Sequence, residues 1–161
     1  MAIERLWIMR HGEAAQGSPD AARRLTSRGE ADVQRMAAWL ADELSDAECQ
    51  ALRIVASPFI RAQQSAALVA ETLGGELDTL DCITPDDAPM AVIDWLQANA
   101  GQPLLLVSHM PLVGELTACL SEGPRARGLG FATAAVASLE AEVWAAGCAT
   151  LRGLTAPGEL R

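Results

Sequence analysis

Residues 6–13 read Leu6-Trp7-Ile8-Met9-Arg10-His11-Gly12-Glu13, an apolar run that stops at an arginine and a histidine. A second apolar run, Leu104-Leu105-Leu106-Val107, stops in the same way at Ser108-His109. These are the two histidines of the chain. Between them, Ile54-Val55-Ala56 is followed by Ser57-Pro58 and then by Arg61. Short apolar runs bounded by turn residues are typical of buried parallel strands. We therefore expect both histidines, Arg10 and Arg61 at the carboxyl ends of three strands.

Strand and helix patterns alternate along the rest of the chain. The sequence predicts strands at residues 3–9, 52–56, 77–80, 103–107, 134–139 and 149–154, and helices at 27–45, 58–73, 90–99 and 111–120. Ser27 and Glu30 fit a capping box, and Ser57 and Pro58 fit an N-cap and a first helical position. Alternation of this kind predicts an α/β fold: one domain over residues 1–161, a three-layer sandwich with a mainly parallel central sheet flanked by helices. The last two strands lack a helix between them, so we expect an antiparallel hairpin at one edge.

Composition excludes several classes of protein. The chain has 161 residues, half of them hydrophobic, which is typical of one globular domain. Its apolar runs are too short to span a bilayer and its N-terminus does not resemble a signal peptide, so a cytoplasmic location is expected. The net charge of -9 argues against a nucleic acid or a membrane surface as partner. A monomer is favoured, although the oligomeric state is left open.

The basic residues and the cysteines narrow the chemistry further. All 12 basic residues are arginine, which excludes a Walker A lysine and a lysine Schiff base. Four widely spaced cysteines are predicted to be core thiols, without disulfides or a zinc site. Two histidines without a nearby carboxylate pattern make a poor metal site. We therefore predict that the protein needs neither a metal nor a cofactor.

The predicted rim of histidines and arginines suits phosphoryl transfer. Ligands of parallel α/β sheets bind beyond the carboxyl ends of the strands. A neutral imidazole can attack phosphorus and carry the phosphoryl group, while guanidiniums hold the equatorial oxygens and offset their charge. Because Pro111 can open a helix after His109, the backbone amide of Met110 could also face the anion.

The order of these segments resembles the histidine phosphatase superfamily, also called the phosphoglycerate mutase-like fold, and within it the small SixA-type phosphohistidine phosphatases without a helical insertion. The segments that carry the resemblance span nearly the whole chain: Ile8–Glu13, Arg23–Thr26, Ser57–Ala62, Leu105–Gly114 and Thr133–Ala137.

The resemblance implies a role for each site residue. His11 would be the nucleophile that becomes transiently phosphorylated, Arg10 and Arg61 would bind the phosphoryl group, and His109 would complete the pocket and stabilise the transition state. Arg23 matches a further arginine of the pattern that could contact phosphate or substrate. Its neighbour Arg24 stands where relatives often have proline, so which of the two faces the pocket is left open.

A general acid is the missing part of this pattern. Expelling an alkoxide from a phosphate ester needs a proton donor, and the ester-cleaving relatives supply a carboxylic acid. The corresponding region here offers Asp81, Asp86 and Asp87, of which the last two also fit turn and cap positions. A phosphohistidine substrate relaxes the requirement, because its imidazole leaving group departs readily.

We therefore predict a phosphohistidine phosphatase that acts on a phosphorylated protein, such as the histidine phosphotransfer domain of a signalling relay. Arg125 and Arg127 could form part of an open rim for that partner, or they could be solvated loop residues. Two alternatives stay open. One is a phosphatase of small phosphate monoesters with Asp86 or Asp87 as acid, and the other is a non-catalytic phosphate-binding module.

Overall fold

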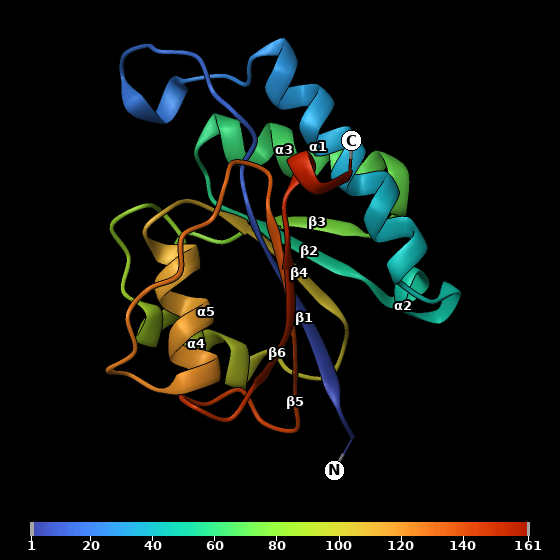
Figure 1. The fold of residues 1–161 in the computed structure, drawn as a ribbon, viewed down its shortest axis with the longest axis vertical. Coiled ribbons are helices and arrows are strands. Elements are labelled where there is room, and N and C mark those ends of the chain that lie inside the picture. The colour runs from blue at the N-terminus through green and yellow to red at the C-terminus, as the bar shows by residue number, and fades with distance from the viewer. Residues whose placement is uncertain (1, 161) are drawn as a thin grey trace.

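The computed structural model describes residues 2–160, and six strands in that range form one mixed sheet (Figure 1). The strands lie in the order β3-β2-β4-β1-β5-β6. Their bounds are β1 (Glu4–Arg10), β2 (Arg53–Ala56), β3 (Glu76–Thr79), β4 (Leu104–Ser108), β5 (Val136–Ala141) and β6 (Thr150–Thr155). The first four strands of that order pair in parallel, whereas β5 pairs antiparallel with both β1 and β6. The predicted α/β class and the antiparallel hairpin at one edge are confirmed.

Helices cover both faces of the sheet and complete the three layers (Figure 1). One face carries α1 (Ser27–Glu43), α2 (Asp46–Ala51) and α3 (Ile60–Leu73), and the other carries α4 (Pro89–Ala98) and α5 (Leu112–Glu122). Alternate residues of β1 point into the two hydrophobic cores, one on each face of the sheet. Trp7 and Met9 pack in the core beneath α1 and α3, while Leu6 and Ile8 pack in the core beneath α4 and α5. Burial on both faces explains why this strand has no polar position between residues 6 and 9.

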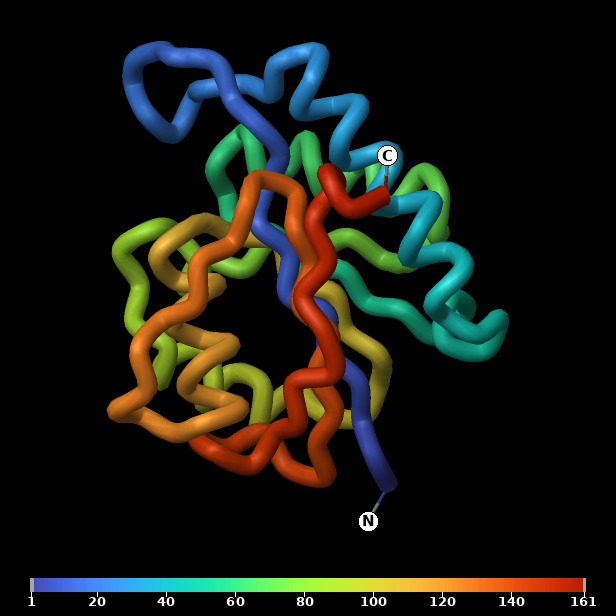
Figure 2. Tube along the Cα trace, in the orientation of Figure 1, coloured from blue at the N-terminus to red at the C-terminus, as the bar shows by residue number. Residues whose placement is uncertain are grey.

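The chain between β1 and α1 leaves the sheet as a long loop and returns to it (Figure 2). Ala14 and Leu25 form an isolated antiparallel bridge at its base, and a short 3-10 helix, η1 (Asp20–Ala22), lies within it. The Leu25 amide also donates to Gln64 Oε1 on α3, at 2.8 Å. A second 3-10 helix, η2 (Pro157–Leu160), packs its Leu160 against the cluster beneath α1. The loop after β1 is therefore anchored to α3.

Two predicted helix caps are wrong, although α1 begins at Ser27 as predicted. The N-cap of α1 is Thr26, whose hydroxyl accepts from the Gly29 amide at 2.9 Å, so Ser27 and Glu30 form no capping box. Thr26 is fixed there because its amide donates to the Glu13 carbonyl at 3.0 Å and its hydroxyl to Glu13 Oε1 at 3.1 Å. On α3, the N-cap is Phe59 rather than Ser57, because the Ser57 hydroxyl contacts a histidine instead, as described below.

Helix α2 is absent from the predicted elements, although Ser45 and Glu48 form a complete capping box there. The strand predicted from residue 134 begins at Val136, because Ala134 has a left-handed φ of 64° that ends extended structure. Of the cysteines, Cys119 is a core thiol as predicted, Cys49 and Cys82 are half-buried, and Cys148 is exposed.

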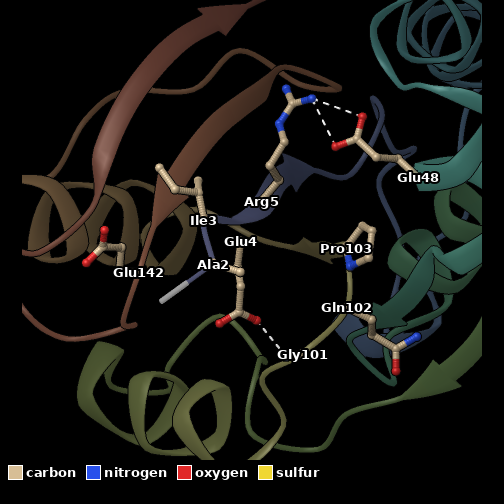
Figure 3. Close-up of a pocket in the computed structure, with 9 residues that line it drawn as sticks. All are labelled: Ala2, Ile3, Glu4, Arg5, Glu48, Gly101, Gln102, Pro103 and Glu142. Atoms are coloured by element: carbon tan, nitrogen blue, oxygen red, sulfur yellow. Dashed lines mark hydrogen bonds and ion pairs between the residues drawn. The ribbon is translucent and has the colours of Figure 1, made fainter.

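A groove of about 500 Å³ lies at the amino ends of β1 and β4, remote from the two histidines (Figure 3). Acidic side chains dominate its polar lining, which consists of Glu4, Arg5, Glu48, Gln102 and Glu142. Across residues 2–160, the helices are too short or too polar for any of them to cross a membrane.

Candidate active site

Strand register brings the predicted residues together. Arg10, the last residue of β1, lies opposite Ser108, the last residue of β4, so His11 and His109 both follow at the same edge. Their rings lie 5.1 Å apart between centroids, tilted by 60°. On the other side of β4, Ala56 pairs with Val107, which places Ser57 beside His109. The prediction that three strand ends converge is confirmed.

Hydrogen bonds fix the tautomer of His11. Its ring is buried, with 7% of the residue exposed, and Nδ1 lies 2.7 Å from the Gly12 carbonyl oxygen. A carbonyl oxygen can only accept, so Nδ1 carries the proton and the lone pair is on Nε2. Arg61 Nε donates towards that lone pair at 3.3 Å. The nitrogen with nucleophilic capacity therefore faces the helix that carries Arg61.

Burial keeps His11 neutral. Desolvation is the main cause that lowers its pKa to about 4, and the nearby guanidiniums of Arg61, Arg10 and Arg23 lower it further, while the Gly12 carbonyl opposes the shift. At neutral pH the imidazole is thus uncharged, as a nucleophile must be.

Gly12 is required by the close approach of its backbone to α1. A Cβ at this position would lie 2.8 Å from both the Gly29 carbonyl oxygen and Val33 Cγ2. The Gly12 amide donates to Ser65 Oγ at 3.0 Å, and that hydroxyl donates to the Arg61 carbonyl at 2.8 Å. Gly12 therefore permits, and Ser65 fixes, the position of His11 relative to α3.

His109 is held by Ser57, a residue predicted to be a helix cap. Its Nε2 lies 2.7 Å from Ser57 Oγ, and that hydroxyl oxygen accepts a hydrogen bond from the Phe59 amide at 3.2 Å. His109 is 1% exposed, and within residues 2–160 its buried Nδ1 has no hydrogen-bond partner. Its pKa is lowered to about 3, chiefly by burial and then by His11 and Arg61. Both imidazoles are therefore neutral at pH 7.

Arg10 and Arg61 place two guanidiniums against these rings. Arg10 is half-buried and donates from Nη1 to the Phe131 carbonyl at 2.7 Å, while its Nε is buried and has no partner among the described residues. Burial and the charge of Arg61 lower its pKa. Arg61, on the first turn of α3, is 4% exposed. Two neighbouring cations, one buried and the other half-buried with an unpartnered Nε, favour an anion between them.

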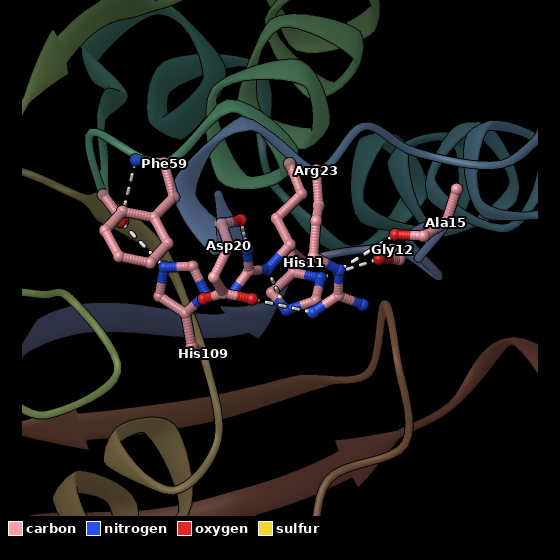
Figure 4. Close-up of polar contacts among 9 residues, drawn as sticks. His11, Gly12, Ala15, Asp20, Arg23, Phe59 and His109 are labelled. Atoms are coloured by element: carbon pink, nitrogen blue, oxygen red, sulfur yellow. Dashed lines mark hydrogen bonds and ion pairs between the residues drawn. The ribbon is translucent and has the colours of Figure 1, made fainter. Parts of the chain in front are cut away.

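The loop after β1 adds Arg23 and the carboxylate of Asp20, which is not among the predicted site residues (Figure 4). Arg23 Nε donates to the Ala15 carbonyl at 2.9 Å, and Nη1 donates to Asp20 Oδ1 at 3.0 Å. Asp20 also accepts from Arg61 through its carbonyl at 2.7 Å and through Oδ2 at 3.1 Å. Arg24, by contrast, is exposed, so Arg23 is the loop arginine that faces the site.

The other candidate residues lie elsewhere or in structural contacts. Asp87 Oδ2 accepts from the amide and the hydroxyl of Thr84, both at 2.7 Å, as expected for a turn residue, and Asp86 is exposed. Met110 is half-buried and packs against the apolar cluster of α4 and α5, so a contact between its amide and an anion stays a prediction. Arg125 and Arg127 are exposed. Among residues 2–160, three or more His, Cys, Asp or Glu side chains nowhere gather as a metal ion would require.

Known proteins resemble this chain in sequence and in fold. Residues 6–84 match the family model of the histidine phosphatase superfamily (branch 1). The chain is 37% identical to the phosphohistidine phosphatase SixA homolog of Haemophilus influenzae over 122 residues, which cover 70% of this chain and 74% of that protein. It is 35% identical to the phosphohistidine phosphatase SixA of Escherichia coli over 142 residues, or 83% of each chain. A solved structure of the protein histidine phosphatase SixA complexed with tungstate superposes with a TM-score of 0.85 and 33% identity, covering 98% of this chain and 99% of that one.

Proposed function

The chain belongs to the histidine phosphatase superfamily, and from that membership we propose that it is a SixA-type phosphohistidine phosphatase. Its substrate is a protein that carries a phosphorylated histidine, such as a histidine phosphotransfer domain. The observation that carries the proposal is the state of His11: neutral, with the Nε2 lone pair beside Arg61.

The reaction has two displacements at phosphorus. In the first, His11 Nε2 attacks in line, the P–N bond to the substrate histidine breaks, and its electron pair leaves with that imidazole, which takes a proton from solvent. In the second, water attacks phospho-His11, the new P–N bond breaks, and the products are inorganic phosphate and neutral His11. Arg10 and Arg61 offset the charge that spreads over the phosphoryl oxygens in both steps.

His109 supplies a neutral hydrogen-bond donor. The Ser57 hydroxyl accepts from the Phe59 amide and can donate its own proton to His109 Nε2. In that tautomer Nδ1 carries a proton and has no partner among the described residues. A phosphoryl oxygen or the leaving nitrogen would satisfy this buried donor.

The states of Asp20 and of the candidate acid Asp87 favour P–N over P–O cleavage. Hydrogen bonds from Arg23 and Arg61 lower the pKa of Asp20, so this carboxyl is ionised and is a poor proton donor at neutral pH. Asp87 is engaged by Thr84. An alkoxide leaving group would need an acid, whereas an imidazole leaving group is easily protonated by solvent.

The test is a pair of phosphate-release assays with EDTA present, one on a phosphohistidine-bearing protein and one on an aryl phosphate ester. Wild type should release phosphate much faster from the phosphoprotein. His11→Ala should lose at least about a thousandfold of that rate, keep the wild-type melting temperature within a few degrees and still bind inorganic phosphate.

Two outcomes would overturn the proposal. A preference of wild type for the ester would indicate a small-molecule phosphatase. No turnover of either substrate, with phosphate still bound, would indicate a phosphate-binding module. Arg28→Ala, which removes an exposed arginine of α1, is a matched control for the loss of a side chain and should retain full activity.

A further inference from the structure

We propose that Asp20 is a specificity-determining residue, whose carboxylate occupies the arginines of the phosphoryl site and must be displaced before an anion binds there. The site thereby selects phosphoryl groups carried on a protein over free phosphate and small phosphate esters. This inference rests on the proposed function and concerns a residue outside the predicted set.

The contacts of Asp20 define its position. Its carbonyl and Oδ2 accept from Nη1 and Nη2 of Arg61, at 2.7 and 3.1 Å, and its Oδ1 accepts from Arg23 Nη1 at 3.0 Å. In Figure 4 the carboxylate lies between the ring of His109 on one side and His11 with Arg23 on the other. A phosphoryl group within reach of His11 would require that same space and the same guanidinium donors.

The carboxylate satisfies only part of the site. His109 Nδ1 and Arg10 Nε are both buried, and neither has a hydrogen-bond partner within residues 2–160. A planar carboxylate offers two oxygens, both already in contact with arginines. A tetrahedral phosphoryl group offers three oxygens and carries more charge. The phosphoryl group of a correctly placed substrate can therefore replace the Asp20 carboxylate and form more hydrogen bonds with the site.

Asp20 is also placed to leave. Its side chain is 58% exposed, and it belongs to the three-residue turn η1 in the loop after β1. Ion pairs with an exposed partner are weak, so displacing this carboxylate costs a ligand about fivefold in affinity.

That cost falls unequally on different ligands. Inorganic phosphate or a small ester has only its phosphoryl contacts with which to displace Asp20. A phosphoprotein has additional contacts with the rim, and binding energy from remote parts of a substrate can offset an unfavourable rearrangement at the reacting centre. Asp20 therefore lowers occupancy by product phosphate and by small phosphates more than it lowers occupancy by a phosphoprotein.

The test compares Asp20→Asn and Asp20→Ala with Asp42→Asn, a control that removes one exposed negative charge from α1. Affinity for inorganic phosphate and for tungstate is measured by titration calorimetry at fixed ionic strength, because exposed charges are screened by salt. We expect both Asp20 variants to bind these anions about fivefold more tightly than wild type, and Asp42→Asn to bind them as wild type does.

Kinetics add a second readout. The ratio of kcat/KM on the phosphohistidine protein to kcat/KM on an aryl phosphate should fall about fivefold in Asp20→Asn. Unchanged or weaker anion binding in variants that keep the melting temperature of wild type would overturn the inference. Weaker binding would mean that Asp20 serves to orient Arg61. Calorimetry needs no turnover, so tighter binding in a protein that does not hydrolyse phosphohistidine would refute the proposed function while leaving the carboxylate contact established.

Discussion

The two ends of the central sheet differ in their open volume and in the side chains that they carry. At the amino ends of β1 and β4 lies a groove of about 500 Å³, whose polar lining is mainly carboxylate (Figure 3). At the carboxyl edge of the sheet, His11, His109 and Arg61 of α3 are each less than a tenth exposed. The roomy end carries no imidazole, while the tightly filled end carries both. Volume alone would therefore direct attention to the wrong end.

The arginines at the two ends differ in how they are paired. Arg5, at the amino end, donates to both oxygens of Glu48 at 3.1 Å, and its Cζ lies 4.5 Å from the ring centroid of Trp7. At the carboxyl end, Asp20 is the one carboxylate among the described residues that pairs with either arginine of the phosphoryl site. It pairs with Arg61 and with the loop residue Arg23, but not with Arg10. A charge that the fold neutralises supports structure, whereas one left in excess supports anion binding.

The sharpest test of this comparison removes one arginine from each end. Arg61→Ala should lower kcat/KM on the phosphoprotein about a thousandfold, because it removes the donor beside His11 and the charge that offsets the transferring phosphoryl group. Arg5→Ala should leave kcat/KM within about twofold, and it should lower the free energy of unfolding by about 1–2 kcal/mol, because Glu48 loses its partner and Trp7 its cation–π contact. Steady-state kinetics and urea denaturation of both variants measure these effects. Comparable losses of turnover in the two variants would show that the ends are not functionally distinct.

Acid should act on the carboxyl end. The pKa of His11 is lowered from 6.5 to about 4 and that of His109 to about 3, so the unfolded chain binds more protons than the folded one below pH 6.5. The contribution of the two histidines to the free energy of unfolding is therefore fully present above about pH 6.5, and it falls as the pH declines towards 4. For His11 alone the loss reaches about 3 kcal/mol. Activity should persist over the same window, since His11 of the folded enzyme stays neutral until about pH 4.

Urea denaturation between pH 4.5 and 7.5 checks this prediction in wild type, His11→Asn and Arg5→Ala. The histidine variant should show a flatter dependence of the free energy of unfolding on pH, while Arg5→Ala should run parallel to wild type. An Arg5→Ala curve that flattens as much would place the acid-sensitive groups at the amino end instead.

The positions of the site residues at the carboxyl ends of the strands are predicted correctly from the sequence, whereas those of their contacting neighbours are not. The difference has a physical reason. His11, His109, Arg10 and Arg61 follow apolar runs, and parallel strands must end at one edge, so adjacency follows from the strand pattern alone. Ser57 was misinterpreted because its local sequence suits a helix cap, and its contact with His109 arises only from the pairing of β2 with β4.

Asp20 lay beyond any local pattern. Its place depends on how the loop after β1 folds back, through the Ala14–Leu25 bridge and the bond from Arg23 to Ala15. No periodicity specifies such an excursion. The missed helix α2 is different, because its capping box at Ser45 and Glu48 can be read in the sequence.

A smaller loss of kcat/KM is expected for Arg23, which is intermediate between Arg5 and Arg61. Arg23 has a side chain that is 24% exposed, it pairs with Asp20, and its charge lowers the pKa of His11. Because it shares Asp20 with Arg61, its charge is only partly neutralised, and its side chain is less buried than that of Arg61. Arg23→Ala should lower kcat/KM on the phosphoprotein about tenfold, and Arg24→Ala, at the exposed neighbouring position, should stay within about twofold. Because the two variants make the same change in charge one residue apart, a long-range electrostatic effect would appear in both. Equal losses would mean that the loop attracts the phosphoprotein through net charge, whereas a loss in Arg23→Ala alone would extend the set of incompletely neutralised arginines from the sheet edge to the loop.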